Sequence, residues 1–156
     1  MIDAEVHAVA KFFFLTLKDH RVAHEATRRS LLRINKIQKN NKEQSDDSIE
    51  LVFTTYRYWK MFHKPKHKLP FFSSHEKSGN DVISQENKFF LPKDLSISAW
   101  NQFMKDSKED ELLLVTWSRV LNISDGDIAR GLGLSEGTVR YRVANGLKKL
   151  GKSLAS

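Results

Sequence analysis

The sequence predicts an all-α protein with a small N-terminal helical domain, a linker and a C-terminal domain of four helices. Apolar residues recur at helical spacing on both sides of the centre of the chain, and no stretch shows a convincing strand alternation. All three prolines lie between residues 65 and 92. A chain of 156 residues holds one ordinary domain or two very small ones. We therefore expect domains at residues 1–62 and 96–156, joined by a linker at residues 63–95.

The N-terminal domain is predicted from three apolar stripes, each on one face of a helix. Asp19-His20 and the polar stretch from Asn40 to Asp47 separate the stripes, so three helices are expected. The stripes are formed by Val6, Val9, Ala10, Phe13 and Leu17, by Ala23, Ala26, Ser30, Ile34 and Ile37, and by Ile49, Val52, Phe53, Tyr56 and Trp59.

The linker region, residues 64–96, combines turn formers and mixed charge without a sustained helical or alternating period. We expect an extended or partly disordered connector. Two pairs of aromatic residues, Phe71-Phe72 and Phe89-Phe90, are too apolar for a free linker. These pairs are expected to dock on a neighbouring domain.

The C-terminal domain is predicted to begin with a short helix carrying Trp100 and Phe103. A second helix is indicated by Leu113, Thr116, Trp117, Val120 and Leu121. Two further helices follow, because Ser124 with Asp127 forms a capping signature and Ser135 is a good N-cap. Their apolar faces are formed by Ile128, Ala129 and Leu132, and by Val139, Val143, Leu147, Leu150 and Leu154.

The last two helices have the spacing of a DNA-reading helix-turn-helix. Ala129, Gly133 and Val139 are separated by four and six residues. The small Ala129 lets the second helix cross the first, Gly133 supplies the positive φ of the turn, and Val139 fills the angle between the helices. The turn also accounts for the run Gly131-Leu-Gly133. Such a unit places the first residues of its second helix in the major groove of DNA.

The predicted DNA contacts lie at the start of that second helix. Arginine can read guanine bidentately, serine and threonine can reach phosphates or base edges, and glycine allows close backbone approach. From Gly126 onward there are six Lys and Arg residues against two acids, so positive charge accompanies this helix. The alternative is a packed helical hairpin with a solvated basic face. The candidate DNA-binding residues are Ser135, Glu136, Gly137, Thr138, Arg140, Tyr141 and Arg142.

At these residues the chain resembles region 4 of bacterial sigma factors, particularly the compact extracytoplasmic-function type. The resemblance covers residues 97–154 and runs from Asp125 through Arg142 to Gly146-Leu-Lys-Lys-Leu150. Its most specific part is Gly137-Thr138-Val139 followed by Arg142 and the Leu-x-x-Leu ending. Helix-turn-helix domains of response regulators share part of this pattern and are the nearest alternative.

The N-terminal domain resembles sigma region 2 more weakly. Glu25, Arg28 and Arg29 occupy the polymerase-binding helix of that family, which implies a contact with core RNA polymerase. The family usually has a Gln-Glu pair where Arg28 and Arg29 stand, so here base replaces acid and these arginines would oppose a basic polymerase surface. The resemblance also implies that four residues contact the melted DNA strand, since aromatic rings stack on unpaired bases and lysines bind phosphates. Those residues are Tyr56, Tyr58, Trp59 and Lys60, for which the alternative is core packing and a solvated lysine tail.

Several classes of function are disfavoured by composition. The absence of cysteine excludes disulfides, thiolate zinc sites and cysteine nucleophiles, and is compatible with a cytoplasmic protein. The longest early apolar run, residues 12–15, is too short to cross a membrane. His63 and His67 are better read as solvated than as metal ligands, because no carboxylate lies between Glu50 and Glu76. No catalytic motif is present, so we expect neither an enzyme nor a cofactor.

The leading functional prediction is a sigma-factor-like transcription initiation factor. Its expected partners are double-stranded promoter DNA, core RNA polymerase and an anti-sigma or other regulatory protein, without a membrane. The net charge of +7 favours a polyanionic partner without identifying it. Two alternatives are a sigma-derived DNA-binding regulator and a protein-interaction module, neither of which engages polymerase in the usual way.

Overall fold

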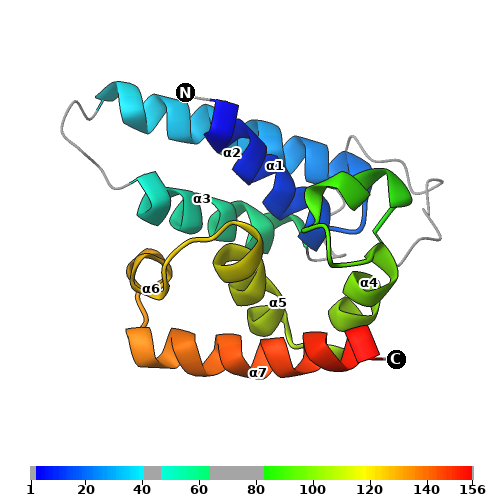
Figure 1. Ribbon diagram of the computed structural model, residues 1–156. Helices are drawn as coiled ribbons and strands as arrows, with labels where there is room; N and C mark the ends of the chain where they lie inside the picture. Colours follow the sequence, from blue (N-terminus) through cyan, green and yellow to red (C-terminus); the bar gives the residue numbers. More distant parts are fainter. Residues whose placement is uncertain (1–2, 41–46, 64–82, 156) are drawn as a thin grey trace.

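A computed structural model describes residues 3–40, 47–63 and 83–155 of the chain and confirms the all-α prediction. The described residues form helices joined by short turns, and none of them lies in a strand (Figure 1). No helix in these ranges combines the length and apolar character that a membrane span requires. The elements are α1 (Asp3–Thr16), α2 (His20–Asn40), α3 (Asp47–Phe62), the 3₁₀ helix η1 (Gln85–Phe90), α4 (Ile97–Asp106), α5 (Glu109–Val115), the π-helical segment η2 (Thr116–Val120), α6 (Asp125–Leu132) and α7 (Glu136–Ala155).

Short polar side chains fix where several helices begin. The Asp19 carboxylate accepts hydrogen bonds from the backbone N–H groups of Arg21 and Val22, at 2.9 and 3.3 Å. Ser96 Oγ accepts from the N–H of Ala99 at the start of α4, at 3.1 Å. These contacts satisfy donors that the first turn of a helix leaves without an intrahelical partner. The predicted break at Asp19-His20 is therefore confirmed.

The N-terminal and C-terminal helices share one hydrophobic core. Trp117, which is 1% exposed, stacks on Phe12 of α1 with a centroid separation of 5.1 Å, and its Nε1 donates to Thr55 Oγ1 of α3 at 3.0 Å. Trp100 of α4 donates from Nε1 to the carbonyl oxygen of Leu15, at 2.8 Å. The predicted domain boundaries stay a prediction, to which the structure adds extensive packing between the two helical regions.

The described part of the predicted linker is folded against α1. Phe90 is buried and stacks on Phe14 with a centroid separation of 5.8 Å, whereas Phe89 is exposed. Ile83, Leu91 and Leu95 are buried in the same cluster. These apolar residues follow no regular period, yet one 3₁₀ turn brings them together, so this stretch differs from the expected extended connector. Phe71-Phe72 lie outside the described residues.

Gly131 is required by the packing of two helices and not by the turn that the sequence pattern indicates. It lies within α6 and faces α3, where a Cβ built on it would stand 2.8 Å from the Cβ of Val52 and 3.0 Å from the carbonyl oxygen of Ile49. Only a residue without a side chain allows α6 and α3 to approach this closely. The earlier interpretation is wrong for Gly131 and holds for Gly133.

Candidate nucleic-acid interface

The turn between α6 and α7 has the geometry that the sequence predicted. Gly133 adopts φ +69° and ψ +33°, in the left-handed region. The N–H of Leu134 donates to the carbonyl oxygen of Ala129 at 2.9 Å, which ends α6. Ser135 Oγ accepts from the N–H of Thr138 at 3.1 Å, which begins α7. Two helices therefore meet through a turn of three residues.

The angle between α6 and α7 is held by small and β-branched side chains. Val139 is fully buried, and Ala129 and Val143 are 4% and 5% exposed. Ser124 Oγ accepts from the N–H of Asp127 at 3.2 Å, so the predicted cap of α6 is confirmed. The start of α7 is thereby positioned by packing and by capping at both ends of α6.

Replacement of Gly133 by valine is expected to destabilise the protein by roughly 1–2 kcal/mol, because a β-branched residue is strained at positive φ. Duplex binding should fall with it, since α7 would lose its fixed angle to α6. Thermal unfolding of the full chain measures the first effect. Gly151→Val is a matched control: Gly151 lies in α7, has no positive φ, and has open space around its Cβ position. Equal melting temperatures for the two variants would contradict a strained turn.

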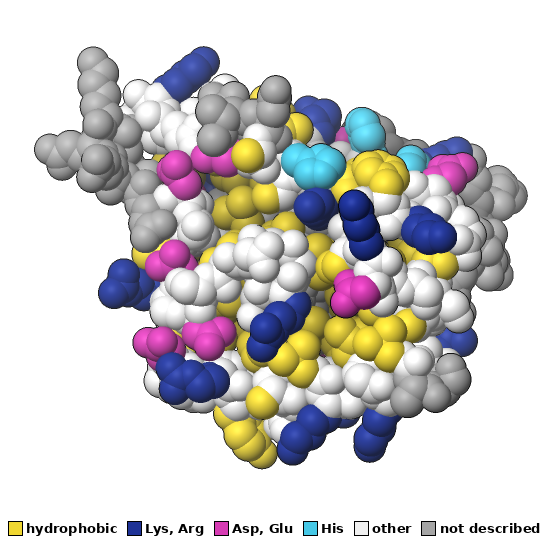
Figure 2. All heavy atoms as spheres, viewed as in Figure 1, with side chains coloured by type: hydrophobic (Ala, Val, Ile, Leu, Met, Phe, Trp, Pro, Cys, Tyr) yellow, Lys and Arg dark blue, Asp and Glu magenta, His cyan; other side chains and the backbone are white. Residues whose placement is uncertain are grey.

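One face of α7 points away from the rest of the protein. Ser135, Glu136 and Gly137 are exposed, and Tyr141 is 70% exposed. A Cβ on Gly137 would meet no atom within 4 Å, so a ligand could approach the backbone there. Lysine and arginine side chains also project along the lower edge of the molecule in Figure 2, where α7 runs in Figure 1. The predicted contact surface is therefore accessible.

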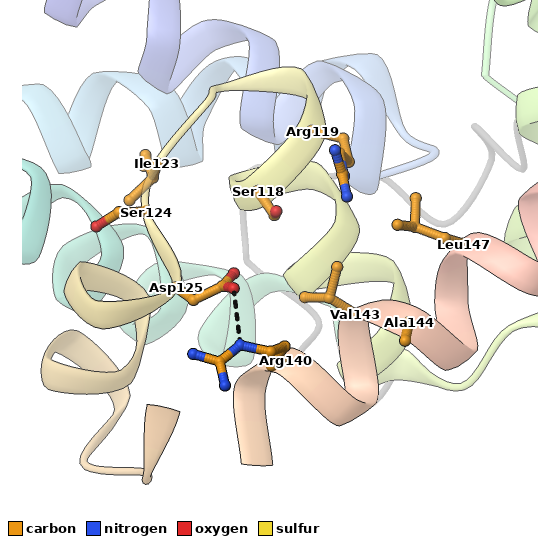
Figure 3. Close-up of a pocket in the computed structure, with 9 residues that line it drawn as sticks. All are labelled: Ser118, Arg119, Ile123, Ser124, Asp125, Arg140, Val143, Ala144 and Leu147. Atoms are coloured by element: carbon orange, nitrogen blue, oxygen red, sulfur yellow. Dashed lines mark ion pairs between the residues drawn. The ribbon is translucent and has the colours of Figure 1, made fainter. Parts of the chain in front are cut away.

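The two predicted base-reading arginines lie on opposite flanks of this face. Positions two apart on an α-helix point about 200° apart, and Tyr141 lies between them. Arg140 Nη2 is 3.1 Å from Glu136 Oε1, and its Nε is 3.8 Å from Asp125 Oδ2 at the start of α6 (Figure 3). Arg142 instead turns toward α5, where its Nε is 3.6 Å from Asp110 Oδ2. Both arginines thus have carboxylate partners. The i, i+4 spacing of Glu136 and Arg140 is visible in the sequence, whereas the contacts with Asp125 and Asp110 depend on how the helices pack.

An open groove of about 350 Å³ lies beside Arg140, between η2, the start of α6 and α7 (Figure 3). Val143 and Leu147 form apolar parts of its wall, while Ser118, Arg119 and Ser124 add polar groups. Arg119 is exposed and is not among the contact residues that the sequence predicts, because the helical pattern of this segment points only to its buried face. When a helix enters the major groove of DNA, guanidinium and hydroxyl groups beside that helix are suited to bind the phosphates of a DNA strand.

The residues expected to contact a melted strand are largely packed into the protein. Trp59 is 4% exposed and stacks on His63 with a centroid separation of 3.9 Å. Tyr56 is half-buried against Trp117 and lies under the Lys60 ammonium, while Tyr58 is half-buried. An unpaired base could reach Trp59 only if the indole left the core. The structure therefore places Trp59 and Tyr56 as the core alternative predicts.

A different set of residues on α3 is accessible. Phe53 is 46% exposed, and Arg57 and Lys60 are exposed with it. These residues follow the spacing i, i+4 and i+7, which puts them on one helix face. The same spacing is visible in the sequence, but the apolar stripe predicts that Phe53 is buried, and that prediction is wrong. The accessible aromatic and basic surface of α3 thus consists of Phe53, Arg57 and Lys60.

The expected polymerase contacts form a compact charged network on α2. Glu25 accepts from Arg28 at 2.6 and 3.1 Å and from Arg29 Nε at 2.9 Å. The hydrogen bond from Arg28 is the largest cause of the low pKa of Glu25, which is about 2. Burial opposes it, and the hydrogen bond from Arg29 and the charges of both arginines lower the pKa further. The guanidinium of Arg29 also lies over the ring of Phe62, 5.4 Å from its centroid. The network therefore links α2 to the end of α3.

Acid is expected to weaken the fold through Glu25. Because the pKa of Glu25 in the folded state lies below its ordinary value of 4.5, its stabilising contribution is complete above about pH 4.5 and is lost as the pH falls through about 2. Denaturant unfolding of the unaltered protein and of Glu25→Gln, at several pH values between about 2 and 4.5, measures the difference in their free energies of unfolding. The stability gap between them should narrow toward low pH. A gap independent of pH would mean that the carboxylate is not paired in solution.

Within the described residues no three His, Asp or Glu side chains are grouped to hold a metal ion, and His67 lies outside those residues. No family model matches the chain, and neither a curated protein nor a solved structure matches it.

Proposed function

We propose that the protein is a sigma-factor-like transcription initiation factor that binds double-stranded promoter DNA through α6 and α7 and recruits core RNA polymerase in the cytoplasm. The observation that carries the proposal is the left-handed turn at Gly133, followed by a capped helix whose first residues are exposed. The resemblance of residues 97–154 to sigma region 4 gives this geometry its functional meaning. The protein has no catalytic role in the proposal.

The first turns of α7 supply groups of the kinds that read DNA. Arg140 would contact guanine, and Tyr141 would lie against the groove floor. Ser135 and Thr138 would meet a phosphate near the positive end of the helix dipole. Lys148 and Lys152, farther along α7, are exposed and suited to phosphate contacts. Lys149 is less available, because its Nζ is 2.6 Å from the buried carboxylate of Glu111.

The carboxylate partners of Arg140 do not prevent base reading. Exposed ion pairs contribute only about 0–1 kcal/mol, whereas a bidentate arginine–guanine contact contributes about 1–3 kcal/mol of discrimination. Arg140 is 65% exposed and Glu136 57% exposed, so their pair belongs to the weak class. Giving up the exposed Glu136 pair therefore costs less than the discrimination that a guanine contact would supply. In the free protein the carboxylates of Glu136 and Asp125 hold the Arg140 guanidinium beside the open groove between η2, α6 and α7.

Replacement of Arg140 by alanine is expected to weaken binding to the specific duplex by about 1–3 kcal/mol, if it reads a base, with little change on random DNA. Arg142→Ala has the same expectation on the opposite flank. Lys148→Ala should give a small, sequence-independent loss and a shallower dependence on salt. Fluorescence anisotropy at several salt concentrations measures these effects, with Lys105→Ala, at an exposed position of α4, as the control. Equal losses on specific and random DNA would reassign an arginine to phosphate contact.

A DNA-binding regulator that does not engage polymerase in the usual way is the second candidate. Two observations favour this candidate: Trp59 is buried, and α6 packs closely on α3 at Gly131. Both make parts of the region 2-like helix α3 inaccessible to a melted DNA strand. Co-purification with core RNA polymerase tests the first proposal. Duplex binding without polymerase binding would support the regulator, and absence of both would support a protein-interaction module.

A further inference from the structure

The outer face of α2 is a basic ridge, formed by Arg21, His24, Arg28, Leu32, Lys36 and Lys39, all of them exposed. These residues follow one another at intervals of three and four, so they share one side of the helix. The opposite side carries Ala23, Ala26, Ser30 and Ile34, which are buried. The ridge is therefore a continuous surface feature running along most of the helix.

The charge on α2 is more one-sided than the fold requires. The helix contains six Lys and Arg residues but one acidic residue, Glu25, and its first turn has no acid. Like charges on a helix repel, and cations near its N-terminus oppose the helix dipole. The buried face holds α2 in place without help from Lys36 or Lys39. A partner with acidic groups would offset the repulsion between these cations.

Contacts near both ends fasten the helix that carries the ridge. Arg28 and Arg29 share the Glu25 carboxylate, and Arg29 reaches Phe62 on α3. Near the other end, Gln38 Nε2 lies 3.1 Å from both carboxylate oxygens of Glu5 on α1. α2 is thus fastened to both neighbouring helices. Binding therefore orders the exposed side chains of the ridge but need not order the helix backbone.

We propose that the basic ridge docks an acidic helix of a partner protein, with Leu32 contacting an apolar side chain of that helix. Arg21, Arg28 and Lys36 are spaced by seven and eight residues, or about 10–12 Å, which matches two turns of a helix lying alongside. Leu32 is 58% exposed between these cations. An apolar side chain there can contribute to a protein contact and is of little use to a phosphate chain.

The position of α2 also favours a protein partner over the DNA bound by α7. The two helices run along opposite sides of the molecule, with α3, α5 and α6 between them (Figure 1). A duplex on α7 would therefore leave the ridge accessible. The inference rests on the proposed function only in placing DNA on α7, and the acidic chemistry of the partner follows from the charge of the ridge itself. A partner with a basic docking surface would be repelled.

The test uses the full chain and a fluorescent helical peptide as long as α2, with glutamates spaced by seven residues and a central leucine. Lys36→Glu combined with Lys39→Glu is expected to weaken peptide binding by about tenfold or more. The control, Lys93→Glu with Lys105→Glu, makes the same charge change at exposed sites elsewhere and should have little effect. Leu32→Ala should weaken binding several-fold. Circular dichroism melting checks that each variant is folded.

The proposal would be overturned if the peptide failed to bind the unaltered chain, or if the ridge and control variants lost equal affinity for it. It would also be overturned if an oligonucleotide displaced the peptide completely and Leu32→Ala had no effect on peptide binding. That last outcome would identify a nucleic-acid surface. Promoter-duplex binding, measured on the same variants, should be unchanged by the ridge substitutions. Peptide binding without any duplex binding would refute the proposed function but would still support the docking of an acidic helix on the ridge.

Discussion

Replacement of Trp117 by alanine is expected to lower the free energy of unfolding by about 3–5 kcal/mol, as for other large aromatic side chains removed from a core. The indole is almost completely buried, stacks on Phe12, meets Tyr56 edge-on and donates to Thr55. Its loss would leave a cavity between elements from both ends of the chain. Urea unfolding of the full chain, followed by far-ultraviolet circular dichroism, measures the effect.

A second variant separates the hydrogen bond from the packing around Trp117. Thr55→Val keeps the shape of residue 55 but leaves the indole N–H without its acceptor, at a cost of about 1–3 kcal/mol. Both variants should unfold in one transition, because the N-terminal and C-terminal helices share a core. A Trp117→Ala protein in which α1 to α3 kept their original stability would show that the two regions fold independently.

Replacement of Gly131 by leucine is expected to destabilise the protein by about 1–3 kcal/mol or more, because it overpacks the contact between α6 and α3. Even the Cβ would stand 2.8 Å from two side-chain atoms of Val52, and the Ile49 backbone prevents easy retreat. The C-terminal helices would be forced away from α3. Thermal unfolding of the full chain measures the loss.

The control for Gly131 is Gly137→Ala in the exposed face of α7. Open space surrounds its Cβ position, and alanine favours the helix over glycine by roughly 0.5–1 kcal/mol. Gly137→Ala should therefore raise the melting temperature while Gly131→Leu lowers it. A Gly131→Leu protein as stable as the unaltered chain would mean that α6 does not pack on α3 in solution.

Local signals in the sequence were sufficient for the helices and for the helix-turn-helix. Ser124, Gly133 and Ser135 act on their immediate neighbours, so their roles could be deduced from spacing alone. Gly131 could not be assigned in this way, because its contact with Val52 depends on how two distant helices cross. The same applies to η1, whose apolar residues have no period and fold because α1 offers them a surface.

The exposure of the start of α7 could be deduced from the sequence, whereas the ion pairs of its arginines with other helices could not. Tyr141 and Gly137 are exposed on α7, as the helical pattern implied. The pairing of Arg142 with Asp110 depends on the crossing of α5 and α7, which the sequence does not specify. Trp59 had two readings because a helical stripe does not reveal whether a further helix covers it. In the structure it is buried.

The contacts of the tryptophans also set an order of events during synthesis. Trp117 meets Thr55 across 62 positions of the chain, and Trp100 meets Leu15 across 85. A ribosome therefore releases α1 and α3 long before the side chains that complete their core exist. In that interval Phe12 and Thr55 belong to an unfinished apolar surface, of the kind that promotes aggregation or recruits chaperones. Folding of the first helices is completed by residues made much later.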